Sequence, residues 1–495
     1  MGIIEKQSIR NLVLTYFGIG LGFISTLYLF PFILTTEEYG LTRILLSIAF
    51  ITSEFTHLGI KNIAIKFFPE FENHQKKHNG ILFLLMVIPL IGYLLFLIFF
   101  FLFDDWLIAK YSVDSNLFGE FHLFLLPLVF GILYFDVINS YVRANKDSIP
   151  GTFVNEVLLR VLLIALLILM NFDVIDFELF IVGFVFCHLI QPILLLLYIA
   201  SKKLLFINPN LKFLSKELIK RLGGYGFYVL LGGISHLIVN NIDILMLGSI
   251  SGLTDTAIYT IAFYIGSVIL VPQKSIGKIA PSIISTHIFN SNIGEVERIY
   301  KSSSINQLVL GFLLFTGIVS NIHNIFEILP QEYSGAFWVI IYIGISKLID
   351  MAGGVNGTII MNSPYYRFNL VATLFLIVIS ILLNLLLIPK YGITGAAIAT
   401  MISLLLYNIA KGLYVYIKYR IQPLSTKIIP IVFVSILLIS ISFQINTIVG
   451  TYIDITVRSI LILILYGLVM VFFKISPEVE SYWSKALNLV QWKKI

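Results

Sequence analysis

The chain has 495 residues, of which 58% are hydrophobic and 12% are charged, and its formal net charge is +6. A soluble domain normally carries about twice this fraction of charged residues, because its surface must be solvated. The composition therefore excludes a soluble protein and indicates a polytopic membrane protein whose positive charge faces anionic membrane lipid, with no nucleic acid as partner.

Apolar segments recur along the whole chain at the length that crosses a bilayer, roughly 20 residues for a helix. We predict an all-α membrane protein with about fourteen transmembrane helices. The first six predicted spans cover residues 11–33, 41–60, 80–103, 117–142, 151–170 and 177–200. The other eight cover residues 222–247, 255–273, 303–325, 335–360, 365–388, 392–417, 427–445 and 455–473.

The basic residues lie in alternate gaps between these spans. One set of gaps, which includes both termini, holds 26 of the 33 lysines and arginines, whereas the other set holds four basic residues and thirteen acids. Three more, Arg160, Lys347 and Lys411, fall inside spans. Because Lys and Arg near span ends resist translocation, we predict that both termini are cytoplasmic.

The sequence repeats itself at a spacing of about 213 residues. Ile48-Ala49-Phe50 recurs as Ile261-Ala262-Phe263, and residues 66–69 (KFFP) recur as residues 278–281 (KIAP). Asp136 precedes Pro150 by the same fourteen residues that separate Asp350 from Pro364. We therefore predict two parallel six-helix lobes around a central cavity, an arrangement common in transporters. The predicted domains are residues 1–205, residues 206–420, two additional helices within 421–474, and a cytoplasmic amphipathic tail at 475–495.

Several short motifs carry a family resemblance. They are residues 8–11 (SIRN), 38–41 (EYGL), 241–243 (NID), 332–333 (EY) and above all 387–400 (LIPKYGITGAAIAT). They resemble polysaccharide flippases of the multidrug/oligosaccharidyl-lipid/polysaccharide exporter superfamily, over roughly residues 5–420. The resemblance implies a bacterial inner-membrane protein that moves an isoprenoid-pyrophosphate-linked oligosaccharide outward by alternating access. The pathway, O-antigen of lipopolysaccharide or capsule, stays open, as does assembly with a polysaccharide polymerase and chain-length machinery.

Basic side chains within spans are the candidate contacts for an anionic substrate. A buried charge costs at least ~2.5 kcal/mol on insertion scales, so it normally faces the bundle interior or a wet cavity. The candidates are Arg160, Lys347, Lys411 and, at the outer edge of span two, Arg43. An internal ion pair with Glu156, one helical turn before it, is the alternative role of Arg160. Lys347 precedes Asp350 by three residues, so an internal pair is its alternative. Lys411 lies near a membrane end, where snorkelling is the alternative.

Membrane acids are candidates for gating. Asp136 and Asp350 occupy equivalent positions in the two repeats, which suits a symmetric gate that pairs with basic residues when it is closed. Glu54 and Glu156 are the other candidate gate residues. Packing is the alternative for each of them.

Asp243 is the candidate coupling residue, because carboxylate and amide oxygens suit a hard cation and Asn240 lies one turn before it. In lipid II flippases a sodium site uses an acid, an asparagine and a threonine, and Asp243, Asn384 and Thr400 resemble the matching positions. Ile388 stands where those relatives place a second acid, so sodium, protons and uncoupled transport all stay open. The scattered histidines show no metal-ligand spacing, and we predict no metal and no cofactor besides a coupling ion.

Three other functions share parts of this pattern. A lipid II flippase would carry several arginines in spans one, two and eight, and a multidrug exporter usually lacks the two additional helices. A membrane oligosaccharide polymerase or glycosyltransferase would need a long outer loop, whereas the longest outer gap is about 15 residues. We therefore predict a transporter with no catalytic residues.

Overall fold

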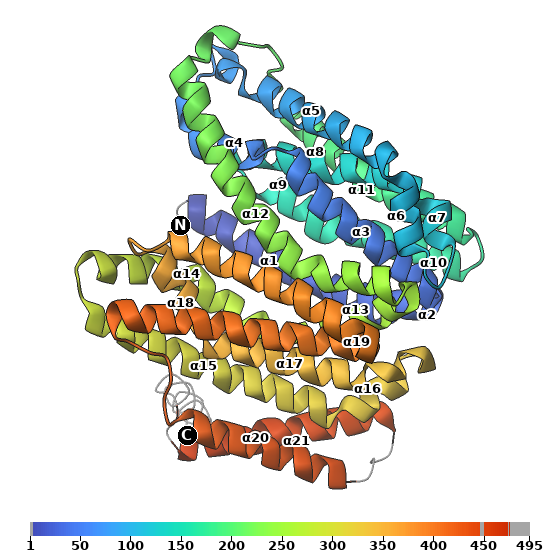
Figure 1. Ribbon diagram of the computed structural model, residues 1–495, viewed down its shortest axis with the longest axis vertical. Helices are drawn as coiled ribbons and strands as arrows, with labels where there is room; N and C mark the ends of the chain where they lie inside the picture. Colours follow the sequence, from blue (N-terminus) through green and yellow to red (C-terminus); the bar gives the residue numbers. More distant parts are fainter. Residues whose placement is uncertain (1–2, 446–449, 474, 476–495) are drawn as a thin grey trace, which may run out of the picture. The chain divides into compact units, whose positions relative to one another are not determined.

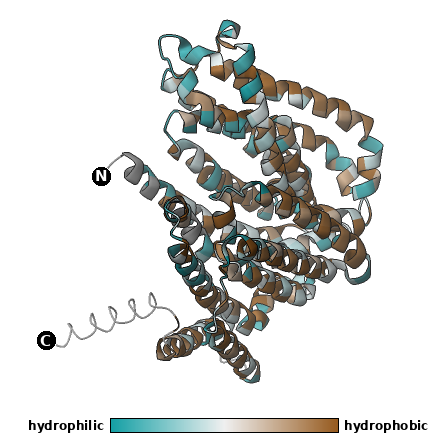
Figure 2. Cartoon of the chain, turned by 60° about the vertical axis from the view of Figure 1, so that its left-hand side comes forward, coloured by the Kyte–Doolittle hydropathy of each residue, from teal (hydrophilic) through white to brown (hydrophobic). Residues whose placement is uncertain are grey.

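The computed structural model describes residues 3–445, 450–473 and 475, and all its regular elements are helices. The predicted amphipathic tail at 475–495 lies, apart from Ile475, outside the described residues. Among these described residues, ten helices are long and apolar enough to cross a membrane, or up to twelve if each of two bent pairs is one span. Apolar residues run along most of the length of these helices, and hydrophilic residues gather at helix ends and loops (Figure 2). The all-α membrane fold is confirmed, and the count of fourteen stays a prediction.

The chain forms two compact units, Met1–Ala257 and Ile258–Ile495. The helices of the first unit are α1 (Ile3–Phe23), α2 (Phe30–Ile33), α3 (Thr36–Thr56), α4 (Ile60–Phe71), α5 (Ile81–Leu102), α6 (Asp104–Tyr111), α7 (Leu117–Phe121), α8 (Leu125–Ala144), α9 (Ile149–Thr152), α10 (Leu159–Asn171), α11 (Phe177–Ser201) and α12 (Lys216–Ile250). Helix α13 (Leu253–Ser267) runs across the boundary between the units. Helix α8 packs against α3, α4, α5 and α11 and forms the centre of the first unit (Figure 1).

The helices of the second unit are α14 (Val271–Phe289), α15 (Ile293–Ser320), α16 (Ile322–Ile328), α17 (Phe337–Ala352), α18 (Asn356–Met361), α19 (Arg367–Tyr419), α20 (Ile428–Gln444) and α21 (Thr451–Phe472). Helix α15 contacts α14, α17, α20 and α21, so it joins the predicted additional helices to the rest of this unit. The predicted domain boundaries at 205 and 420 stay predictions.

The EYGL motif shapes the start of α3. Thr35 and Glu38 cap the helix reciprocally, because the Thr35 hydroxyl accepts the Glu38 N–H at 3.2 Å and the Glu38 carboxylate accepts the Thr35 N–H at 2.8 Å. Tyr39 is fully buried. Any Cβ at Gly40 would lie 2.0 Å from the carbonyl oxygen of Leu253, so only glycine permits this approach.

Helix α19 contains the LIPKYGITGAAIAT motif and is interrupted by it. At 1.5 Å per residue, 53 helical residues would extend about 80 Å, more than twice the thickness of a bilayer core. Gly392 has the backbone angles φ 53° and ψ −133°, which are not helical. A Cβ at Gly395 would lie 2.2 Å from the carbonyl oxygen of Leu387, so the chain turns tightly here. The motif therefore separates two predicted spans, 365–388 and 392–417.

Two sequence predictions about span ends were wrong. Lys61 and Lys66 were assigned to a gap, but they lie on α4, whose apolar face is buried and which meets α3 at 42°. The break between α3 and α4 falls at Leu58 and Gly59, which both have positive φ. The single span predicted at 335–360 is divided into α17 and α18 near Gly354, whose φ is 53°.

Candidate functional site

The first unit holds a cluster of charged side chains at the break between α3 and α4. The Glu54 carboxylate lies 3.0 Å from Nε2 of His57 and 2.5 Å from Nζ of Lys61. Lys61 also contacts Oδ2 of Asp136 on α8 at 3.2 Å. Glu54 and His57 are buried, whereas 36% of the Asp136 side chain is exposed. The cluster therefore extends from the buried Glu54, through Lys61, to the partly exposed carboxylate of Asp136.

Glycines of helix α12 pack closely against this cluster and against the break between α3 and α4. A Cβ at Gly233 would lie 2.0 Å from Oε1 of Glu54, and a Cβ at Gly59 would lie 2.4 Å from the carbonyl oxygen of Gly226. Helix α12 is itself bent, by 43° between its parts 216–235 and 237–250. Two bent helices therefore approach each other where the charged cluster lies.

The second unit repeats part of this arrangement with neutral partners. Gln273, at the start of α14, donates from Nε2 to Oδ2 of Asp350 at 3.3 Å, and Asn408 donates to Oδ1 at 3.2 Å. Asn356 in turn donates to Asn408 at 3.1 Å. Lys61 and Asp136 are 75 residues apart, and Gln273 and Asp350 are 77 apart, so the same pair of repeat positions makes contact in both units. One pair is ionic and the other pairs an amide with a carboxylate.

Two buried lysines of the second unit lie against aromatic rings. Lys347 on α17 is 7% exposed, and its Nζ lies 4.4 Å from the centroid of the Phe263 ring. Lys411 on α19 is 6% exposed and donates to the Tyr407 hydroxyl at 3.0 Å. A Cβ at Gly357 would lie 2.7 Å from Nζ of Lys411. Lys411 is therefore enclosed among helices and does not snorkel.

The two candidate arginines have partners within the first unit. Arg160 pairs with Glu156 at 3.1 Å, as their spacing allowed, and about a quarter of each side chain stays exposed. The Arg43 guanidinium lies 5.0 Å and 4.7 Å from the ring centroids of Phe30 and Tyr39, which are both buried. These contacts stabilise both cations, and substrate binding by them stays a prediction.

The predicted coupling residues belong to different units. Asp243 and Asn240 lie on α12 of the first unit, and Asn384 and Thr400 lie on α19 of the second. Asp243, Asn384 and Thr400 are buried. Within the described residues, no group of three or more His, Cys, Asp or Glu side chains is arranged to hold a metal ion. The coupling site stays a prediction.

Sequence reasoning missed several members of the polar clusters. His57 follows Glu54 by three residues, a spacing at which side chains meet on a helix, whereas Lys61 lies beyond the break at Leu58 and Gly59. Gln273 stands 212 residues after Lys61 and was available from the repeat. Arg458, near the start of the predicted span 455–473, was not a candidate site residue; it is buried on α21 and pairs with Asp454 at 2.5 Å. Its signal was an i,i+4 spacing within an apolar segment.

The Arg458 pair fastens the last two helices to the second unit. Asn324 of α16 donates to Asp454 at 2.6 Å, and Arg458 donates to the carbonyl oxygens of Ser442 and Ile445 at 2.6 and 2.8 Å. The buried guanidinium therefore has acceptors from α20, from α21 and from the chain that follows α20. These contacts give it a structural role.

Comparison with known proteins relates the chain to a family and to solved structures. Residues 5–287, more than half of the chain, match the model of the family described as polysaccharide biosynthesis protein. No curated protein matches the sequence. Among solved structures, the lipid II flippase MurJ in an inward closed conformation is 14% identical, with a TM-score of 0.72, and the match covers 94% of this chain and 99% of that one.

A second solved structure shares the fold. It is an inward-facing multidrug resistance MATE family transporter of the MOP superfamily, 15% identical, with a TM-score of 0.66 and coverage of 84% of this chain and 98% of that one. These relatives are named as transporters, in agreement with the prediction that the chain is not an enzyme. The chain belongs to the polysaccharide biosynthesis protein family, and it shares the fold of these two solved transporters.

Proposed function

We propose that this protein is a flippase that moves an isoprenoid-pyrophosphate-linked oligosaccharide from the cytoplasmic to the outer leaflet of the bacterial inner membrane. The family match carries this proposal, because polysaccharide assembly on a lipid carrier needs a transporter for that carrier. The fold shared with a lipid II flippase supports a lipid-linked substrate. Both termini are cytoplasmic in this proposal, and a reporter fused after residue 145 that reads external would contradict it.

Lys347 and Lys411 are the proposed contacts for the pyrophosphate or acidic sugars. Both are buried beside aromatic rings, and a phosphate gives a charged amine a strong hydrogen-bonding partner. Among the described residues Lys411 makes no ion pair, so its charge is available to an anionic ligand. Arg160 and Arg43 are further proposed contacts in the first unit.

Asp136 and Asp350, with Glu54 and Glu156, are the proposed gate residues. Asp136 binds Lys61 just after the break between α3 and α4, so a change at this carboxylate acts where the helix bends. Asp350 binds Gln273 at the start of α14. Lys61 holds its acid by charge and Gln273 by a neutral hydrogen bond. The proposed gate is therefore stronger in the first unit.

Loss of the protein tests this function directly. Depletion of the protein in its native cell should cause a lipid-linked oligosaccharide repeat unit to accumulate on the cytoplasmic leaflet, because synthesis continues without translocation. Mass spectrometry of the extracted lipids identifies the saccharide and its pyrophosphate linkage. Accumulation of lipid II would instead assign the protein to peptidoglycan synthesis, and an unchanged lipid pool with raised drug sensitivity would make it a multidrug exporter.

A further inference from the structure

The turn between α4 and α5 has a strained backbone. Four consecutive residues have φ between 48° and 78°, and they are Lys77, His78, Asn79 and Gly80. Residues other than glycine and asparagine rarely adopt this left-handed region. Such a turn persists only where the surrounding contacts hold it in place. It lies just before the span predicted at 80–103, on the membrane face that we predict to be cytoplasmic.

The connection from α11 to α12, residues 202–215, is bonded to this turn. The Lys77 ammonium donates to Oδ1 of Asn208 at 3.0 Å. The side chain of Asn210 donates to Oδ1 of Asn79 at 3.4 Å. The strained turn therefore holds the segment that leads into α12.

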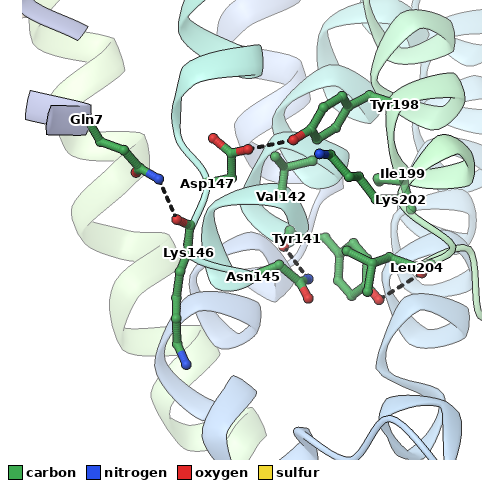
Figure 3. A pocket seen from close by; sticks show the side chains of 10 residues that line it. All are labelled: Gln7, Tyr141, Val142, Asn145, Lys146, Asp147, Tyr198, Ile199, Lys202 and Leu204. Carbon is green, nitrogen blue, oxygen red and sulfur yellow. Dashed lines mark hydrogen bonds between the residues drawn. The ribbon is translucent and has the colours of Figure 1, made fainter. Parts of the chain in front are cut away.

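Aromatic rings join the turn, the connection and α8. The Tyr141 hydroxyl of α8 donates to the carbonyl oxygen of Leu204 at 3.0 Å, at the start of the connection (Figure 3). The Tyr141 ring centroid lies 6.0 Å from that of Phe68 on α4. The His78 ring centroid lies 5.2 Å from that of Phe68 and 5.4 Å from that of Phe206, a residue of the connection. The buried imidazole therefore packs between the turn and the connection that it holds.

The hydrogen bond of His78 defines its protonation state. The backbone N–H of Asn73 donates to Nδ1 of His78 at 3.2 Å, so Nδ1 carries no proton and Nε2 carries the single ring proton. Nε2 is buried and has no hydrogen-bond partner within the described part of the chain. A second proton would have to bind at Nδ1, where it would face the N–H of Asn73. The closed turn therefore requires a neutral imidazole.

The surroundings of His78 oppose its protonation. Burial lowers the pKa of His78, as does the positive charge of His74, whose ring centroid lies 5.9 Å away, whereas Glu72 raises it. Phe68 and Phe206, which face the ring from α4 and from the connection, are uncharged. A released imidazole in solvent binds a proton with a pKa of about 6.5. The closed turn therefore keeps its stability above about pH 6.5 and loses it as the pH falls from there toward the lowered pKa.

We propose that this turn is a pH-sensitive switch, which holds the connection from α11 to α12 while His78 is neutral and releases it when His78 binds a proton. The proton removes the acceptor of the Asn73 N–H and places a charge among aromatic rings, so the strained backbone relaxes. Release frees the start of α12, the helix whose Gly233 packs against Glu54. The switch makes the movement of α12 depend on the pH at this membrane face, whichever lipid the protein carries.

Hydrogen–deuterium exchange of the purified full-length protein tests this proposal. Between about pH 8 and about pH 5.5, peptides that cover residues 72–80 and 204–213 should lose protection by up to about tenfold after correction for intrinsic exchange, because the released state gains a proton. His78→Asn should keep the same protection at both pH values. Its side-chain oxygen accepts the Asn73 N–H without titrating, and asparagine tolerates positive φ.

Two further variants separate the proton at His78 from other effects. His78→Phe keeps a ring but no acceptor, so its turn should be less protected and equally so at both pH values. The matched control is His74→Asn, which removes the exposed neighbouring imidazole and should keep the loss of protection within about twofold of that in the unmodified protein. Peptides of α10 should stay protected throughout.

Three results would overturn the proposal. The first is unchanged protection of residues 204–213 in the unmodified protein at the lower pH. The second is the same pH-dependent loss in both His78 variants as in the unmodified protein. The third is an equal loss of protection in α10, which would mean that acid unfolds the protein as a whole.

Discussion

The buried basic side chains differ in what surrounds them, and the difference separates structural cations from those available to a substrate. Lys61 lies between two carboxylates, and Arg458 pairs with a buried aspartate. Lys411 lies among aromatic and small residues and, within the described chain, has no acidic partner. Removal of a paired cation leaves a buried acid uncompensated, whereas removal of Lys411 does not.

Lys411→Gln should therefore reduce transport without impairing folding. A hydrogen bond to a charged group contributes about 1.5–3 kcal/mol, so we expect the flipping rate in proteoliposomes to fall at least about tenfold. Lys347→Gln should also reduce transport. Lys418→Gln, near the end of the same helix as Lys411, is the control and should keep the native rate. Native rates in both the Lys347 and the Lys411 variants would exclude the cationic contacts proposed here.

Lys61→Gln should instead destabilise the protein. The substitution leaves Glu54 buried without its lysine partner, which costs about 3 kcal/mol or more. Glu54→Gln/Lys61→Gln should recover most of this loss, since neither charge then remains. Thermal unfolding in detergent measures both variants. A double variant that is less stable than Lys61→Gln alone would show that the ion pair does not hold this cluster together.

Sequence reasoning found the acids of these clusters and missed their partners. Glu54, Asp136 and Asp350 stood out because charges within apolar spans are rare. Lys61 was counted as a loop charge, since hydropathy ends a span at its first lysine. Its contact with Asp136 joins residues 75 positions apart and depends on α4 packing against α8. No local pattern contains that information.

At the scale of elements, the helices are interrupted where glycine permits close approach or positive φ. Gly59 ends the bend between α3 and α4, and Gly392 interrupts α19. The sequence predicted the turn at Gly392, because a Pro-Lys-Tyr-Gly stretch separates two apolar segments. It did not predict the helix beyond Gly59, because an amphipathic helix has the mixed composition of a loop when only mean hydropathy is considered.

Two adjacent glycines on α12 provide a matched test of the contact with Glu54. Gly233→Ala would place a Cβ 2.0 Å from the Glu54 carboxylate, and overpacking of this kind costs about 1–3 kcal/mol. Gly232→Ala meets no atom within 4 Å and should be neutral or slightly stabilising, because alanine favours helix. The amount of protein in the membrane and its melting temperature measure the effect of each substitution. Equal effects of the two substitutions would mean that α12 does not press on the acid cluster.

At the scale of the whole molecule, two compact units each carry a broken helix with an acid bound beside the break. The internal repeat predicted this equivalence, and the paired contacts in the two units support it. The division at residue 257 includes α12 in the first unit, a packing relation that a linear hydropathy pattern does not contain. The sequence alone did not show that the equivalent pair is ionic in the first unit, Lys61 with Asp136, and neutral in the second, Gln273 with Asp350.

The proposed role of Asp243 concerns the whole molecule, because coupling links ion binding to a conformational transition of the entire protein. We expect Asp243→Asn to abolish accumulation driven by a cation gradient and to keep passive exchange, since only the energy input is removed. Sodium-dependent substrate binding at fixed pH separates sodium from protons. Normal transport by Asp243→Asn under both gradients would make Asp243 a packing residue.

Flipping by the purified protein is the direct test of the proposed lipid-linked oligosaccharide transport. Proteoliposomes that contain the full-length protein and a fluorescent isoprenoid-pyrophosphate oligosaccharide report translocation when an outer-leaflet quencher or glycosidase is added. We expect flipping at least about tenfold faster than in protein-free vesicles and in vesicles with Lys411→Gln, and slow flipping of lipid II. Rapid flipping of lipid II, or no flipping of any isoprenoid-linked saccharide, would contradict it.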